Sequence, residues 1–241
     1  QIMATHIPKK GEREPSLTDF SPIVEIIWYI RKNRTDITTG NPRPPFLIIA
    51  PTGLLENWRQ EMQLHLVEGA LGEILPAFGT NLGLLRQGRG RDTQSGSAQL
   101  SASAFDGYGV VLTTYETLRD YHMSFARQRF AVAVCDEAQK IKNATSQIRR
   151  AATTVNARFR IALTGTPVEN RLQDLWTIMD WSWPKLLGAS RDFERRYTED
   201  DAAALGELRG QLVDRQDGRP PVMLRRMKSE VLDGLPQKRI V

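Results

Sequence analysis

The chain has 241 residues, of which 40% are hydrophobic and 25% are charged, and its formal net charge of +5 gives a pI of about 9.5. This composition is typical of a globular protein with one sizeable core or two modest ones, and the positive charge is compatible with a polyanionic partner. No apolar run approaches the ~20 residues of a membrane span, and a single cysteine excludes an intramolecular disulfide framework.

The first half of the chain contains two predicted helices and two predicted strands. A helix is expected from Ser21 to Lys32, followed by a polar, proline-rich connector over residues 33–45. Phe46–Ala50 is continuously apolar, which indicates a strand buried on both faces. The next helix has apolar residues at helical spacing, namely Leu55, Trp58, Met62 and Leu66. A second strand is expected over Glu73–Phe78.

The second half alternates between strands and helices after a polar segment. Gly79–Gly107 is rich in glycine and serine and is predicted to be a surface loop with little internal order. Strands are expected at Val110–Leu112, Ala131–Cys135 and Arg160–Leu163, and helices at about Thr145–Val155 and Leu172–Trp181. This alternation predicts an α/β fold with a parallel sheet covered by helices on both faces. Beyond Trp181 the pattern is helical and predicts a protrusion from the sheet lobe.

The adjacent acids Asp136 and Glu137 end the apolar run Phe130–Cys135. At the carboxyl end of a parallel strand, one carboxylate could hold Mg²⁺ and the next could position a water for attack. The alternative is a surface turn in which both carboxylates are merely solvated. The residues Asp136–Gln139 on their own slightly favour this alternative. The surrounding motifs favour the functional interpretation.

Those motifs occur in a fixed order along the chain. They are Pro51–Trp58, Thr113–Glu116, Asp136–Asn143, Leu163–Asn170 and Leu224–Lys228. Together they resemble the Swi/Snf family of ATP-dependent DNA translocases, within helicase superfamily two, from about Phe46 to the C-terminus. The resemblance implies a RecA-like sheet, with ATP and Mg²⁺ as cofactors and double-stranded DNA as partner.

The resemblance also implies catalytic roles. Asp136 would be the carboxylate on the Mg²⁺ side, and Glu137 would orient the attacking water. Gln139 stands where the family often has histidine; it can hydrogen-bond near the γ-phosphate but cannot take up charge. Thr164, Gly165 and Thr166 would couple the acidic motif to the DNA side, although a plain strand-to-helix turn is the alternative.

Six positions are predicted to contact nucleic acid: Thr52, Thr113, Thr114, Lys142, Arg225 and Arg226. Hydroxyls at loop starts suit contacts with the phosphate backbone, although helix capping is the alternative for the threonines. Lys142 could instead be solvated. The two arginines lie in a segment, residues 215–241, with a local charge of +4, and a structural ion pair is their alternative. Trp58 and Tyr115 are expected to pack.

A phosphate loop, G-x-x-x-x-G-K-[ST], is missing from the sequence. The resemblance implies that the chain begins just after such a loop and ends before a second lobe; the alternative is a paralogue that has lost the loop. Residues 1–180 would then be a partial first ATPase lobe, and residues 181–241 a helical protrusion with a basic segment. On this interpretation the chain alone is inactive.

Two functions remain open. The first is part of an ATP-driven translocase on double-stranded DNA that serves remodelling, repair or displacement of a bound protein such as a nucleosome or polymerase. The second is a binding module for nucleic acid or protein that keeps the lobe fold without turnover. An RNA helicase is disfavoured by the sequence around Lys142 and Arg226. The protein would act in the nucleus of a eukaryote or in the cytoplasm and nucleoid of a bacterium, and no membrane is expected.

Overall fold

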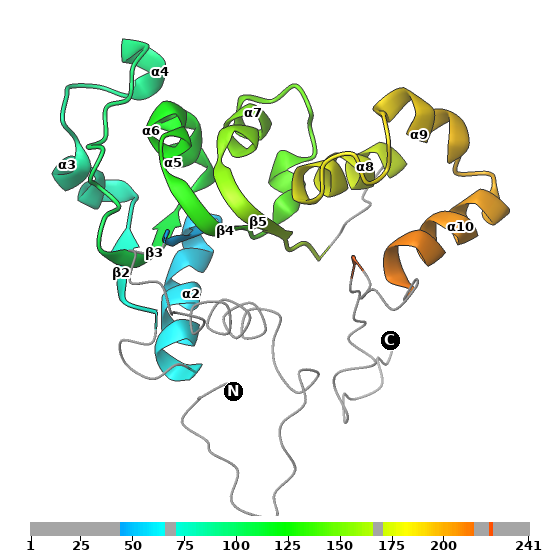
Figure 1. The fold of residues 1–241 in the computed structure, drawn as a ribbon, viewed down its shortest axis with the longest axis horizontal. Helices are drawn as coiled ribbons and strands as arrows, with labels where there is room; N and C mark the ends of the chain where they lie inside the picture. The colour runs from blue at the N-terminus through cyan, green and yellow to red at the C-terminus, as the bar shows by residue number, and fades with distance from the viewer. Residues whose placement is uncertain (1–43, 66–70, 166–170, 215–221, 224–241) are drawn as a thin grey trace, which may run out of the picture.

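A computed structural model describes residues 44–65, 71–165, 171–214 and 222–223. Five parallel strands form one sheet in the order β2-β3-β1-β4-β5 (Figure 1). The strands are β1 (Phe46–Ile49), β2 (Glu73–Pro76), β3 (Tyr108–Thr113), β4 (Arg129–Cys135) and β5 (Asn156–Ala162). All five coincide with predicted strands, although β5 begins four residues before the predicted Arg160.

Helices fill the connections between the strands and continue after β5. They are α2 (Thr52–His65), η2 (Gly79–Asn81), α3 (Leu82–Leu85), α4 (Asp92–Ser95), α5 (Tyr115–Asp120), α6 (His122–Ala126), η3 (Ala138–Ile141), α7 (Gln147–Thr154), α8 (Leu172–Ser182), α9 (Ser190–Arg196) and α10 (Ala202–Val213). The sequence predicted α2, α7 and α8 but did not place α5 and α6. The helix predicted from Ser21 to Lys32 lies outside the described residues.

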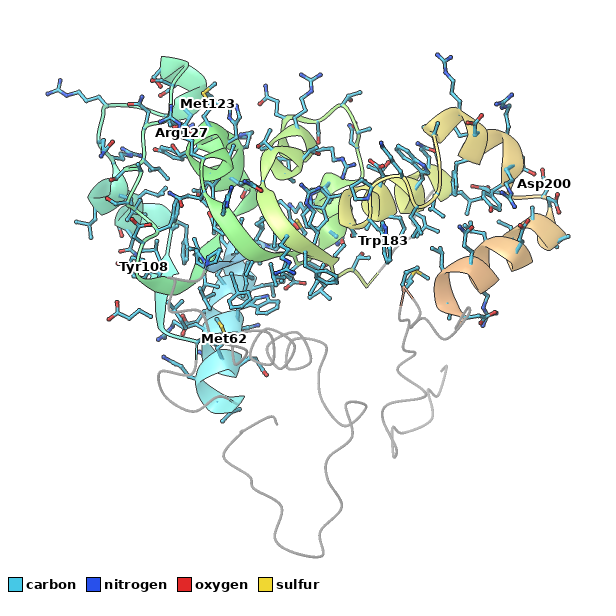
Figure 2. All side chains as sticks on the ribbon, viewed as in Figure 1. Met62, Tyr108, Met123, Arg127, Trp183 and Asp200 are labelled. Carbon is cyan, nitrogen blue, oxygen red and sulfur yellow. The ribbon has the colours of Figure 1, made fainter. Side chains whose placement is uncertain are left out.

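The sheet separates two apolar cores because successive strand residues point to opposite faces. On one face Leu47 and Ile49 join a core with α5, α6, α7 and part of α8. On the other face Phe46 and Ile48 pack against α2, from which the buried Met62 projects (Figure 2). The predicted α/β fold with helices on both faces is confirmed.

A third apolar core lies beyond the sheet, between α8, α9 and α10 (Figure 1). The helix α8 serves two cores, since Ile178 and Trp181 belong to the sheet core while Leu175 and Met179 belong to the third core. The predicted helical protrusion is therefore present, and the proposed division after residue 180 falls inside α8.

The segment 79–107 corrects the prediction of a surface loop with little internal order. Besides η2, α3 and α4, it contains an antiparallel bridge between Arg86 and Leu100. The carboxylate of Asp92 is fully buried and accepts hydrogen bonds from the backbone N–H of Gln99 and of Ser124, both at 2.7 Å. A contact between residues 32 positions apart cannot be seen in local composition, which is why the pattern indicated a loop.

Among the helices of the described residues, none combines the length and the apolar character that a membrane crossing requires.

Candidate active site

The sequence motifs meet at one edge of the sheet, where the carboxyl ends of all five parallel strands lie. Thr114 follows β3, Thr52 follows β1, Asp136 follows β4 and Leu163 follows β5. Backbone pairing continues past the strand ends, with the Asp136 N–H donating to Ile49 O at 2.8 Å and the Leu163 N–H to Cys135 O at 2.8 Å. The strand order therefore places the two exit threonines on one side of the acidic pair and the Thr164 turn on the other.

Asp136 is half-buried, and each of its carboxylate oxygens accepts a hydrogen bond. The Trp58 indole N–H donates to Oδ2 at 2.8 Å, and the Glu137 backbone N–H donates to Oδ1 at 2.9 Å. Burial raises the pKa of Asp136 above its ordinary value, and the bond from Trp58 is the largest influence in the opposite direction. The carboxylate is thus held in one orientation by two donors.

Glu137 has a left-handed backbone, with φ of 52° and ψ of 53°. Few residues other than glycine adopt this conformation, and such strain is often found at functional sites. Its side chain accepts a hydrogen bond at 2.6 Å from Gln139 Nε2. The turn therefore aims Glu137 and Gln139 toward each other immediately after β4.

A hydrogen-bonded relay connects the acidic motif to the turn after β5. Thr164 Oγ1 donates to Gln139 Oε1 at 2.9 Å, and Gln139 in turn donates to Glu137. The Ala138 N–H also donates to Leu163 O at 2.7 Å. A conformational change at the Thr164 turn would therefore be transmitted to Glu137 through the side chain of Gln139. Gly165 is exposed beside this relay, and Thr166 lies outside the described residues.

The three threonines predicted to contact nucleic acid have different environments. Thr52 is exposed at the first residue of α2. Thr114 is buried and caps α5, accepting a bond from the Thr117 N–H at 3.0 Å. Thr113 is fully buried, and its hydroxyl donates to Ala77 O at 2.9 Å. The Thr113 hydroxyl is therefore engaged within the sheet lobe, and its contact with nucleic acid stays a prediction.

The predicted cationic contacts are only partly described. Lys142 is half-buried, and its Nζ lies 3.8 Å from Asp174 Oδ2, an ion pair that connects the end of η3 to α8. A phosphate contact by Lys142 stays a prediction. Arg225 and Arg226 lie outside the described residues.

The acidic pair suits a Mg²⁺ ion that is held together with a substrate. The described residues contain no cluster of three or more His, Cys, Asp or Glu that could hold a metal alone. Mg²⁺ is commonly bound by one or two carboxylates, with waters and substrate phosphates completing its shell. A single oriented carboxylate such as Asp136 fits that requirement.

Two contacts with Asp136 were not predicted from the sequence. Trp58 and Tyr115 were expected to pack, and both are buried as expected. In addition, Trp58 donates to the Asp136 carboxylate, and the Tyr115 hydroxyl donates to Asp136 O at 2.7 Å. These bonds join residues 78 and 21 positions apart. The only sequence signal was that both aromatics carry a polar atom that needs a partner when buried.

Comparison with known proteins supplies the family context. Residues 14–241 match the SNF2-related domain. The chain is 40% identical over 225 residues to the Zorya protein ZorD of Escherichia coli O139:H28, covering 88% of this chain and 19% of ZorD. The chain thus spans about a fifth of that relative.

Two solved structures from Sulfolobus solfataricus have a similar fold. The SWI2/SNF2 ATPase core domain matches with a TM-score of 0.63 and 28% identity, covering 88% of this chain and 38% of that one. The same ATPase core in complex with double-stranded DNA matches with a TM-score of 0.61 and 27% identity, covering 79% and 36%.

Proposed function

This chain belongs to the SNF2-related domain family. We propose that it carries one half of the ATPase active site of a motor that moves on double-stranded DNA. The observation that carries the proposal is the relay from Thr164 through Gln139 to Glu137, next to the oriented carboxylate of Asp136. An arrangement of this kind serves phosphoryl transfer, in which positioning and charge neutralisation do most of the work.

In the proposed reaction a water attacks the γ-phosphorus of ATP, the bond to the bridging oxygen breaks, and ADP leaves. Glu137 orients the water, and Gln139 holds the Glu137 carboxylate in place. Asp136 would hold Mg²⁺, which supplies charge neutralisation for the phosphate oxygens when bound. The Glu137 carboxylate is acceptor-only when ionised, so it can accept a hydrogen bond from the attacking water.

DNA contact is proposed at the β3–β1 side of the same sheet edge. Thr52 is exposed there, and the N-terminal turns of α2 and α5 begin at this edge. Helix N-termini and short hydroxyls suit backbone phosphates, which position a protein without reading sequence. The DNA-bound structure of the Sulfolobus ATPase core supports this choice of partner. Lys142, Thr114 and the arginines Arg225 and Arg226 are proposed to extend this contact.

The test uses the full-length protein with and without double-stranded DNA. We expect DNA-stimulated phosphate release by the unmutated protein, together with displacement of a third strand from a DNA triplex as a measure of translocation. Glu137→Gln should reduce kcat by about 10²-fold or more while MgATP affinity stays within a few-fold, because it removes an interaction made in the transition state. DNA binding without any nucleotide turnover by the unmutated protein would instead support a non-catalytic binding module.

A further inference from the structure

Trp58, in the middle of α2, connects this helix to the acidic pair. Its side chain is fully buried in the core between α2 and the sheet, where neighbouring side chains pack around the indole. From there its N–H donates to Asp136 Oδ2 at 2.8 Å. The same helix begins at the exposed Thr52, after the two residues Ala50 and Pro51 that follow β1. The helix α2 therefore has the proposed DNA contact at its first residue, Thr52. Nearly two turns later, it has the hydrogen bond from Trp58 to the Asp136 carboxylate.

The contact determines the orientation of the carboxylate. Asp136 Oδ1 is held by the Glu137 backbone N–H at 2.9 Å, so its rotation is limited from one side by its own turn. The bond from Trp58 limits rotation from the other side. Without the indole N–H, the second oxygen would have no donor among the described hydrogen bonds. Residues that orient a metal ligand in this way affect metal affinity although they never touch the metal.

A second helix supports the same residue from the other side. Tyr115 begins α5, directly after the capping Thr114, and its hydroxyl donates to Asp136 O at 2.7 Å. Two helices that start at the proposed DNA edge thus each supply one buried aromatic donor to Asp136. The Tyr115 bond holds the backbone, whereas the Trp58 bond holds the carboxylate itself.

We propose that Trp58 is a positioning residue for the carboxylate of Asp136, so that the placement of α2 on DNA sets how well Asp136 holds Mg²⁺ with the nucleotide. This inference rests on the proposed function. It adds a route from DNA to the nucleotide site that runs through α2, separate from the relay through Thr164 and Gln139.

The test compares two tryptophan variants of the full-length protein. Trp58→Phe keeps an aromatic ring in the core and removes only the indole N–H and some volume. Trp181→Phe is the matched control, because Trp181 is 1% exposed and its N–H donates at 3.0 Å to Ala152 O, a structural carbonyl. Both variants should lose a similar free energy of unfolding. Only Trp58→Phe should change the binding of Mg²⁺ at Asp136.

The first readout is ADP binding by calorimetry over a series of Mg²⁺ concentrations. Trp58→Phe should need about tenfold more Mg²⁺ to reach the same ADP affinity, in line with the 10–100-fold effects of residues that orient metal ligands. ADP affinity in EDTA should be unchanged. Trp181→Phe should follow the unmutated protein in both conditions. Stimulation of ATP hydrolysis by DNA should also fall in Trp58→Phe alone.

A second measurement uses the unmutated protein, in case Trp58→Phe does not fold. When Mg²⁺ is added to the ADP complex, the indole N–H resonance of Trp58 should shift while that of Trp181 stays in place. If the Trp58 resonance does not move, or if ADP affinity depends on Mg²⁺ in the same way in both variants, Trp58 does not position Asp136. The proposed function would be unaffected by that result. If the unmutated protein shows no Mg²⁺-dependent ADP binding, the proposed function fails and this inference fails with it.

Discussion

Asp136 carries its charge in an environment that disfavours it. Burial raises its pKa, and the hydrogen bonds from Trp58 and the Glu137 N–H compensate only in part. The folded protein therefore holds the Asp136 proton more tightly than the unfolded chain. The free energy of unfolding must fall as pH rises from the ordinary aspartate pKa through the raised folded value, and the full penalty is present above that folded value.

Replacing Asp136 by asparagine should therefore stabilise the protein in the absence of Mg²⁺. The amide oxygen keeps an acceptor for the Trp58 N–H, whereas the NH2 group cannot accept the second bond from the Glu137 N–H. We expect removal of the buried charge to outweigh the loss of that one bond. We expect a higher urea midpoint for Asp136→Asn at pH 7, a gain that shrinks as the pH is lowered, and loss of Mg²⁺-dependent hydrolysis. If Asp136→Asn is less stable than the unmutated protein at every pH, burial of the Asp136 charge does not lower the free energy of unfolding.

The backbone of Glu137 gives a second prediction at the residue scale. A left-handed conformation costs a residue other than glycine roughly 1 kcal/mol or more, and glycine avoids this cost. Glu137→Gly should raise the free energy of unfolding by up to about 1 kcal/mol while abolishing hydrolysis. Urea unfolding and phosphate release would measure the two effects.

Lys185 is the matched control for this strain. With φ of 69°, it is the other residue besides glycine with positive φ in the described part of the chain, and it is exposed on the loop after α8. Lys185→Gly should stabilise by a similar amount and leave hydrolysis unchanged. If only Lys185→Gly stabilises, the bond between Glu137 and Gln139 outweighs the backbone strain.

At the scale of elements, the segment 79–107 depends on one buried carboxylate. Asp92 accepts from the Gln99 and Ser124 backbone N–H groups and from the Ser124 hydroxyl at 3.0 Å. Asp92→Ala would leave the buried Ser124 N–H without this acceptor, at about 1–3 kcal/mol, while the Gln99 N–H keeps its bond to Ser124 Oγ at 3.1 Å. We expect the segment to open locally and trypsin to cleave it faster at Arg86, Arg89 or Arg91, while the sheet stays folded.

Asp106→Ala is the control for this experiment. Asp106 is an exposed acid in the same segment, so its removal changes the charge equally without breaking the buried contacts. Equal trypsin sensitivity in the two variants would contradict an anchoring role for Asp92. A loss of far-UV circular dichroism across the whole protein in Asp92→Ala would show that the segment is not a separate element.

The elements that the sequence could predict are those whose signal is local. Phe46–Ile49 and Arg129–Cys135 are central strands, and continuous apolar runs indicated both of them. The acidic pair and the Thr164 turn were found because each motif directly follows a strand. The contacts that orient the site were missed, because Trp58 meets Asp136 across 78 positions and Asp92 meets Ser124 across 32. The bond from Thr113 to Ala77 O was also missed, because a threonine has the same sequence pattern whether its hydroxyl points outward or toward a backbone carbonyl.

At the scale of the whole molecule, α8 joins two apolar cores that can be perturbed separately. Ile178 is 4% exposed and packs in the sheet core, while Leu175 is 6% exposed and packs with α9 and α10. One turn of helix therefore separates two side chains of similar size and burial. Truncation of either to alanine should cost about 2–5 kcal/mol.

Cys135 reports on the sheet core alone. It is the only cysteine of the chain, it lies fully buried in that core, and burial raises the pKa of its thiol to about 12. The thiolate is the reactive form, so a thiol reagent at pH 8 should modify Cys135 only when β4 opens. The labelling rate in native conditions then follows the free energy of opening of the sheet core.

Ile178→Ala should accelerate labelling of Cys135 by about 30-fold or more, because 2 kcal/mol of lost stability raises the open population by that factor. Leu175→Ala should leave the labelling rate nearly unchanged while hydrogen exchange becomes faster in α9 and α10. The two variants differ only in which face of α8 loses its side chain, so a difference between them measures the independence of the two cores. Equal acceleration of Cys135 labelling by both variants would mean that the sheet and the helical protrusion open as one cooperative unit. A force on α9 and α10 would then be transmitted directly to β4, the strand that precedes Asp136.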